Sequence, residues 1–178
     1  MKRFPAWCTM VLILSIPGCE EKMKPSVVAL NQGVLPSQES WRSTVTFSDS
    51  AKVKAVLWAG HISVYSPSQY TLLDDSLHVD FYDELEKHSS LLTARRGKVD
   101  DRTQDFEAHE HVVVTSDSGT VLTTERLYWN NAKRQISTDA FVDIVSPKEH
   151  IMGQGMVSDQ SLKNYKIFKV TGRAVSDE

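Results

Sequence analysis

The side chains that could do chemistry in this 178-residue chain are few. The nearest approach to a metal site is His109-Glu110-His111, whose two imidazoles could project from one side of a strand. A solvated strand face explains the same pattern more simply. The carboxylates of Asp100 and Asp101 could serve a polysaccharide-active enzyme, but they fall in a predicted turn that implies no pocket. Nucleophile-elbow and P-loop lysine motifs are absent. The sequence therefore predicts no catalytic residue, no metal and no cofactor.

Charge and cysteine content exclude further classes. The formal net charge is −3, and no dense stripe of lysine and arginine is present, which argues against nucleic acid as a partner. The pairs Arg95-Arg96 and Lys133-Arg134 are interpreted as solvated turn charges, with lipid phosphates as an alternative ligand. Both cysteines, Cys8 and Cys19, lie within the first 19 residues. A disulfide scaffold, a cysteine-based zinc site and a thiol nucleophile are therefore excluded from the remainder of the chain.

The N-terminus is typical of an export signal. A charged start precedes an apolar run over residues 6–16, which is too short for the ~20 residues of a membrane-spanning helix. The run ends in Ile16-Pro17-Gly18-Cys19, which resembles a bacterial lipoprotein signal with Cys19 as the residue that carries the lipid. An ordinary cleaved signal and an uncleaved anchor are the alternatives. We expect a signal peptide over 1–18, a lipidated N-terminus and flexible linker over 19–40, and a periplasmic domain over 41–178.

A short phrase recurs in the rest of the chain, with a branched aliphatic residue two places before a small one. Its copies lie about 30 to 35 residues apart, a spacing typical of repeat architectures. The copies are Leu57-Trp58-Ala59, Leu92-Thr93-Ala94, Leu122-Thr123-Thr124 and Ile151-Met152-Gly153. A second apolar run, at Phe106-Glu107-Ala108 and Ile136-Ser137-Thr138, falls between the later copies. Each unit alternates strand and turn, so the pattern predicts an all-β array of repeated antiparallel hairpins.

The order of these motifs resembles a known family. The Leu-x-Ala strand is followed by Val79-x-Phe81-Tyr82-Asp83, Leu92-x-Ala94, Leu122-x-Thr124 and Ile151-x-Gly153-x-Gly155. Over roughly residues 41–172 this succession resembles LptC, the periplasmic component of the lipopolysaccharide export transporter, with its OstA-like repeats. The resemblance implies a twisted open β-jellyroll with a groove between two sheets, and no enzymatic activity.

The resemblance also implies partners. Lipopolysaccharide would pass from an inner-membrane ABC transporter complex, along the groove, to a periplasmic bridge protein of the same fold. The strand at 44–47 would face the transporter, and the strand near 165–171 would face the bridge. Many family members keep a transmembrane helix, whereas a lipid anchor is expected here, in the inner membrane in preference to the outer membrane.

The recurring residues are the candidates for the groove lining, although a closed sandwich core would need the same alternation. The candidates are Leu57, Ala59, Val79, Phe81, Leu92, Ala94, Phe106, Leu122, Thr124, Ile136, Ile151 and Gly153. The leading function is a non-enzymatic lipopolysaccharide conduit anchored to a membrane and facing the periplasm. The alternative is a structural or protein-binding β-sandwich lipoprotein of the cell envelope that carries no lipid.

Overall fold

The computed structural model describes residues 35–175, which form a single antiparallel sheet of ten strands. The strands are β1 (Gln38–Asp49), β2 (Lys52–Tyr65), β3 (Tyr70–Tyr82), β4 (His88–Ala94), β5 (Arg96–Asp100), β6 (Phe106–Ser116), β7 (Val121–Asn130), β8 (Gln135–Val145), β9 (Glu149–Asp159) and β10 (Tyr165–Val175). One turn of 3-10 helix, Ser66–Ser68, joins β2 to β3. Within residues 35–175 no helix has the length and apolar character needed to cross a membrane. The predicted all-β fold is confirmed, with β1 beginning at Gln38, three residues before the expected start of the domain.

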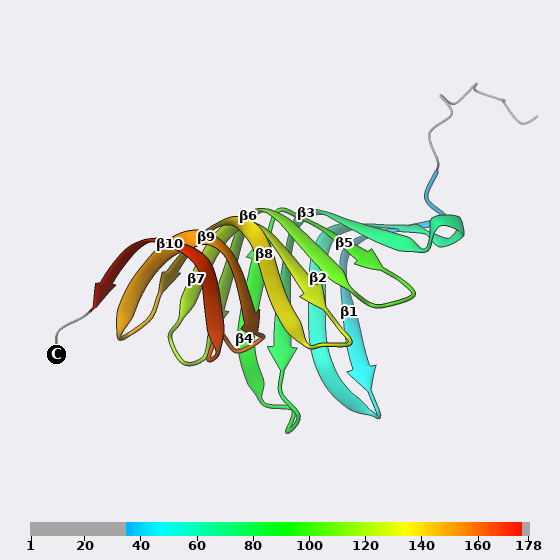
Figure 1. Ribbon diagram of the computed structural model, residues 1–178. Coiled ribbons are helices and arrows are strands. Elements are labelled where there is room, and N and C mark those ends of the chain that lie inside the picture. Colours follow the sequence, from blue (N-terminus) through cyan, green and yellow to red (C-terminus); the bar gives the residue numbers. More distant parts are fainter. Residues whose placement is uncertain (1–34, 176–178) are drawn as a thin grey trace, which may run out of the picture. The chain divides into compact units, whose positions relative to one another are not determined.

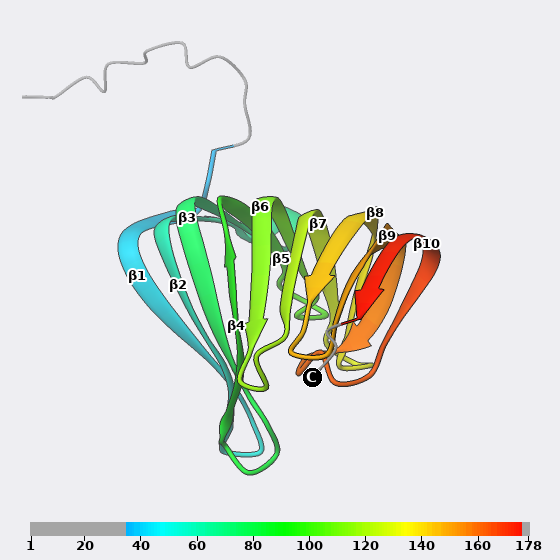
Figure 2. The ribbon, with the colours of Figure 1, turned by 90° about the vertical axis from the view of Figure 1, so that its left-hand side faces the viewer.

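The strands follow one another across the sheet in chain order, as repeated hairpins predict. In Figure 1 they succeed one another from β1 at the right to β10 at the left, and Figure 2 shows the same arch with the β10 side facing the viewer. β4 and β5 share one place in this order. β3 pairs with β4 through its C-terminal half and with β5 through its N-terminal half, and β6 pairs with both in the same way.

The strands bend where they cross the top of the arch, except β4 and β5, which end and begin there (Figure 1). The backbone there leaves regular β geometry, with a left-handed φ of 57° at Asp75, 64° at Glu110 and 76° at Gly155. Arg95, the residue between β4 and β5, accepts a hydrogen bond from the Ser76 amide at 3.1 Å and donates its own amide to the Glu110 carbonyl at 3.0 Å. The bend therefore runs as one line across neighbouring strands. It divides the sheet into two half-sheets, which we call the β4 half-sheet and the β5 half-sheet after the strands that lie entirely on one side.

The recurring phrase forms rows on the inner face of the β4 half-sheet. Its leading residues are linked by direct cross-strand partners in the order Leu57, Val79, Leu92, Val114, Leu122, Ile144, Ile151. In the next row toward the bend, small and large residues alternate: Ala59, Leu77 and Ala94 are neighbours, as are Thr124, Val142 and Gly153. The inner face of the β5 half-sheet contributes Leu73, Val99, Phe106, Leu127 and Ile136 to the same core. The two faces thus bury each other, because the bend brings them together.

The small residue of the last copy of the phrase, Gly153, lies where β10 passes close to β9. A Cβ atom at Gly153 would lie 2.5 Å from Cγ2 of Ile167 and 2.6 Å from the backbone oxygen of Lys169, both on β10. Backbone cannot move away as a side-chain tip can. Gly153 therefore lets β10 pack against β9.

Replacing Gly153 by alanine should destabilise the fold by roughly 1–3 kcal/mol, because the new methyl group forces β10 to shift. Thermal unfolding of the full chain would measure this loss. Gly172→Ala is the matched control on β10, where the nearest atom to an added Cβ is the mobile Cε of Met152 at 2.9 Å. Equal losses in the two variants would contradict the packing role assigned to Gly153.

Candidate functional site

A cavity of about 450 Å³ lies between the two half-sheets, on the side of β1. Its apolar wall comes from Phe47, Ala55, Leu57, Val79 and Phe81 of the β4 half-sheet and from Val99, Phe106 and Trp129 of the β5 half-sheet. The rings of Phe81 and Trp129 meet from opposite half-sheets, with centroids 5.4 Å apart. The cavity lies within the range of about 300–1,000 Å³ that is usual for ligand sites.

The twelve candidate lining residues are all buried, but they occupy two different environments. Leu57, Val79, Phe81 and Phe106 line the cavity. The others lie on the inner faces away from the cavity wall: Ala59, Ala94, Leu92, Leu122, Thr124, Ile136, Ile151 and Gly153. Leu92 and Leu122 have no exposed surface and belong to the packed core. The same rows therefore contain residues of the cavity wall and residues of the packed core.

Four wall residues escaped the sequence analysis, namely Phe47, Ala55, Val99 and Trp129. The strand register explains why Phe47 and Ala55 belong to the wall. Phe47 pairs with Ala55, and Ala55 pairs with Phe81, so the three residues form one row across β1, β2 and β3. The alternation of β1 contained this signal in Thr44-Val45-Thr46-Phe47. Trp129 is the partner of Phe106 on the neighbouring strand, so its place follows only once the β6–β7 register is known.

The rim of the cavity is polar. The lining is completed by Ser48 and Asp49 from β1, Lys54 from β2, Gln104, Asn131, Ala132 and Arg134 from turns, and Gln160. Glu84, in the turn between β3 and β4, forms ion pairs with both Lys54 and Arg134. The apolar wall thus ends in a charged edge.

Beyond the cavity, the turn between β9 and β10 closes the space between the half-sheets. The Ser90 hydroxyl donates to the Gln160 carbonyl at 2.7 Å, and the Ser116 hydroxyl donates to the Ser161 carbonyl at 2.7 Å. Leu162 at the centre of this turn is 1% exposed and packs in the core. Toward β10, the Tyr165 hydroxyl donates to the Glu149 carboxylate at 2.8 Å. The cavity therefore lies between β1 and this turn, and packed core residues such as Leu162 fill the interior at the turn.

Asp159 holds this turn in shape. Its carboxylate accepts hydrogen bonds from the Ser161 amide and hydroxyl, the Lys163 amide, and the amide and side chain of Asn164. Partial burial acts to raise the pKa of Asp159, but the hydrogen bonds from Ser161, Asn164 and Lys163 outweigh it and hold the pKa below its ordinary value of 3.8.

The candidate metal ligands and catalytic carboxylates from the sequence lie at bends and turns, where they have structural roles. Glu110 and His111 lie on the bend line, and within residues 35–175 no three histidine, cysteine or acidic side chains group as metal ligands. The Asp100 carboxylate accepts hydrogen bonds from the backbone amides of Thr103 and Arg102 in the following turn, and these hydrogen bonds lower the pKa of Asp100. Asp101 accepts the Thr71 hydroxyl at 2.8 Å. Cys19, the expected lipid attachment site, lies outside the described residues.

Comparison with known protein families identifies the family to which the chain is similar. A family model described as "Lipopolysaccharide-assembly, LptC-related" matches residues 25–174, which is most of the chain. No curated protein matches the sequence.

Replacing Asp159 by asparagine should lower the thermal midpoint of the full chain by roughly 3–6 °C at neutral pH, because several charge-assisted hydrogen bonds are weakened. A carboxyl with a lowered folded-state pKa stabilises the fold above its ordinary pKa and loses this contribution as the pH falls through the folded value. The difference between variant and wild type should therefore shrink between about pH 5 and about pH 2. Asp49→Asn, whose carboxylate accepts one side-chain bond from Ser50, is the control with a smaller expected effect. A pH-independent difference for Asp159→Asn would refute this role.

Proposed function

Because the chain belongs to the LptC-related family of lipopolysaccharide-assembly proteins, we propose that its cavity receives acyl chains of lipopolysaccharide in transit. Family membership gives the protein a non-enzymatic role in lipopolysaccharide transport and a place in the periplasmic cell envelope. The observation that carries the proposal is the cavity itself, whose wall comprises eight apolar side chains from both half-sheets.

The energetics favour such a ligand. Each methylene group removed from water contributes about 0.8 kcal/mol, so a chain of a dozen methylenes contributes about 10 kcal/mol. A water-filled passage cannot supply this free energy, whereas an apolar wall such as that formed by Leu57, Phe81 and Phe106 can. The aliphatic rows beyond the cavity are packed into the core, so the cavity is the part of the inner face that offers this surface to a ligand.

The edge strands are the proposed joints to the partners. Both carry large exposed apolar side chains, including Trp41 on β1 (63% exposed) and Phe168 on β10 (57%). Unpaired strand edges readily pair with strands of another protein. In this arrangement β1 receives lipopolysaccharide from the inner-membrane ABC transporter complex, β10 delivers it to the bridge protein of the same fold, and a lipid on Cys19 anchors the protein to the inner membrane.

A photo-crosslinking residue at Phe81 should capture lipopolysaccharide in cells, because Phe81 lines the cavity. Tyr82 is the matched control, since it is the next residue on β3 and is absent from the cavity wall. Immunoblots for lipopolysaccharide adducts would compare the two positions. Protein adducts with no lipid adduct at Phe81 would instead favour the protein-binding lipoprotein.

Crosslinking residues on the two edges should separate the partners. Position Thr44 on β1 should capture a subunit of the transporter, and position Lys169 on β10 should capture the bridge protein, because each lies on an outermost strand. Mass spectrometry of the adducts would identify them. Capture of the same protein at both positions, or of the two proteins at exchanged positions, would contradict the proposed direction of transfer.

A further inference from the structure

We propose that Lys54 and Arg134 form a phosphate-binding subsite at the rim of the cavity, for a phosphate group carried by the acylated lipid, and that Glu84 occupies this subsite when no lipid is bound. The inference rests on the proposed function, since it assigns the headgroup of the same ligand whose chains enter the cavity. Nothing in the family match specifies these three side chains.

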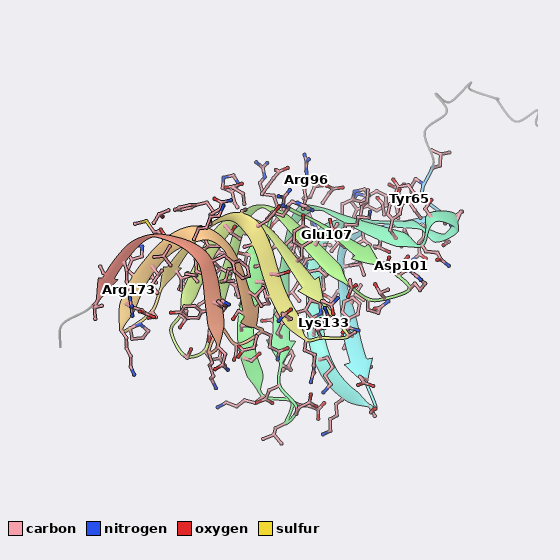
Figure 3. The ribbon with its side chains drawn as sticks, viewed as in Figure 1. Tyr65, Arg96, Asp101, Glu107, Lys133 and Arg173 are labelled. Carbon is pink, nitrogen blue, oxygen red and sulfur yellow. The ribbon has the colours of Figure 1, made fainter. Side chains whose placement is uncertain are left out.

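The two cations reach the rim from opposite half-sheets. Lys54 lies on β2 in the β4 half-sheet, and Arg134 lies in the turn from β7 to β8, which belongs to the β5 half-sheet. Both side chains line the cavity. Figure 3 labels the neighbouring Lys133 on this turn, well below Arg96, which stands at the top of the arch. An anion placed between Lys54 and Arg134 would therefore sit over the open edge of the apolar wall.

Glu84 already shows how an anion fits there. One carboxylate oxygen lies 2.8 Å from Nζ of Lys54, and the other pairs with the Arg134 guanidinium. The turn that carries Glu84 is held against β2, because Lys52 donates its ammonium to the Glu84 carbonyl at 3.1 Å and the Val53 amide donates to the Glu86 carboxylate at 2.9 Å. Asp49 is the other acid of the rim, and it accepts a hydrogen bond from Ser50 at 3.0 Å.

A lipid phosphate would replace Glu84 readily. The Glu84 side chain is 63% exposed, and exposed ion pairs contribute little to stability. A phosphate monoester carries between one and two negative charges and three acceptor oxygens, which suits an ammonium and a guanidinium together better than a single carboxylate does. The Lys54 side chain is only 17% exposed, so its methylene stem lies along the wall while the ammonium stays at the edge. Acyl chains inside and phosphate at the rim would then fix the orientation of the lipid.

The second basic pair of the sequence does not share these surroundings. Arg96 lies on the convex side of the bend and pairs with Asp74 at 3.6 Å and Glu110 at 3.1 Å. Arg96 is absent from the cavity lining. The sequence offered both basic pairs as candidates for binding lipid phosphate and could not rank them. Of these four residues, only Arg134, from the pair Lys133-Arg134, lies at the rim beside Lys54 in the structure.

The test uses the full chain held in amphipol, with a photo-crosslinking residue at Phe47 on the cavity wall. The probes are hexa-acylated lipid A with two phosphates and the same lipid after chemical dephosphorylation. The measured quantity is the yield of the crosslinked protein–lipid adduct. The double variant Lys54→Gln/Arg134→Gln should reduce this yield with the phosphorylated lipid by about tenfold, to the level of the dephosphorylated lipid, because two charge-assisted contacts are lost. Glu84→Gln should raise the yield with the phosphorylated lipid alone, because it removes the competing carboxylate.

Control variants separate this effect from misfolding and from net charge. Arg96→Gln/Lys98→Gln removes two cations outside the cavity lining and should leave both yields unchanged. Lys54→Arg/Arg134→Lys keeps both charges at the rim and should retain the preference for the phosphorylated lipid. Loss of that preference in the Arg96→Gln/Lys98→Gln control would overturn the proposal, because it would reflect overall charge.

The outcomes also distinguish the subsite from the proposed function. Equal yields with the two lipids in the wild type would overturn the subsite while leaving acyl binding in place. No yield with either lipid would contradict acyl binding as well. In a last experiment, inorganic phosphate is added as a competitor of lipid A in the crosslinking reaction. It should compete only weakly, because it has no acyl chains. Displacement of lipid A by an equal concentration of inorganic phosphate would mean that the rim binds a free anion and would overturn its assignment to a lipid.

Discussion

The line along which the strands bend is the constraint on which the rest of the structure depends. A flat sheet of ten strands with one apolar face would leave that face in water. Bending the long strands at the same level, and dividing β4 from β5 there, lets the β4 half-sheet and the β5 half-sheet bury each other. Residues such as Asp75 and Glu110 adopt left-handed φ values for this purpose, at a cost of about 1–3 kcal/mol each. Hydrogen bonds through Arg95 and burial of the aliphatic rows offset that cost.

The rows could be predicted from the sequence because alternation is a property of each strand alone. Leu57, Leu92 and Leu122 were expected on one face, and they lie in one row. The bend was not predicted, since Glu110-His111 looked like part of a continuous solvated strand. Its signal was nevertheless present in β2. The buried positions change parity there, from Leu57 and Ala59 before the bend to Ile62 after it.

The extent of the cavity could not be predicted, because it depends on segments that are remote in sequence. The turn containing Leu162 fills the space between the half-sheets and is held by Ser90, 70 residues before its partner Gln160. Rows that look equivalent in sequence therefore divide into cavity wall and packed core. The rim also depends on segments that are remote in sequence. Its charged residues Lys54, Glu84 and Arg134 come from three separate hairpins and meet only when the arch forms.

The two ends of the groove differ in a way that bears on transport. The β1 side contains the apolar cavity, whereas toward β10 the turn around Leu162 is packed between the half-sheets and Tyr165 is hydrogen-bonded to Glu149. Under the proposed direction of transfer, a lipid that enters beside β1 meets this turn before it reaches β10. The turn is held to the opposite half-sheet by the hydroxyls of Ser90 and Ser116 and by the buried side chain of Leu162. The closure of the interior at this point therefore depends on contacts between the half-sheets and not on strand pairing within the sheet.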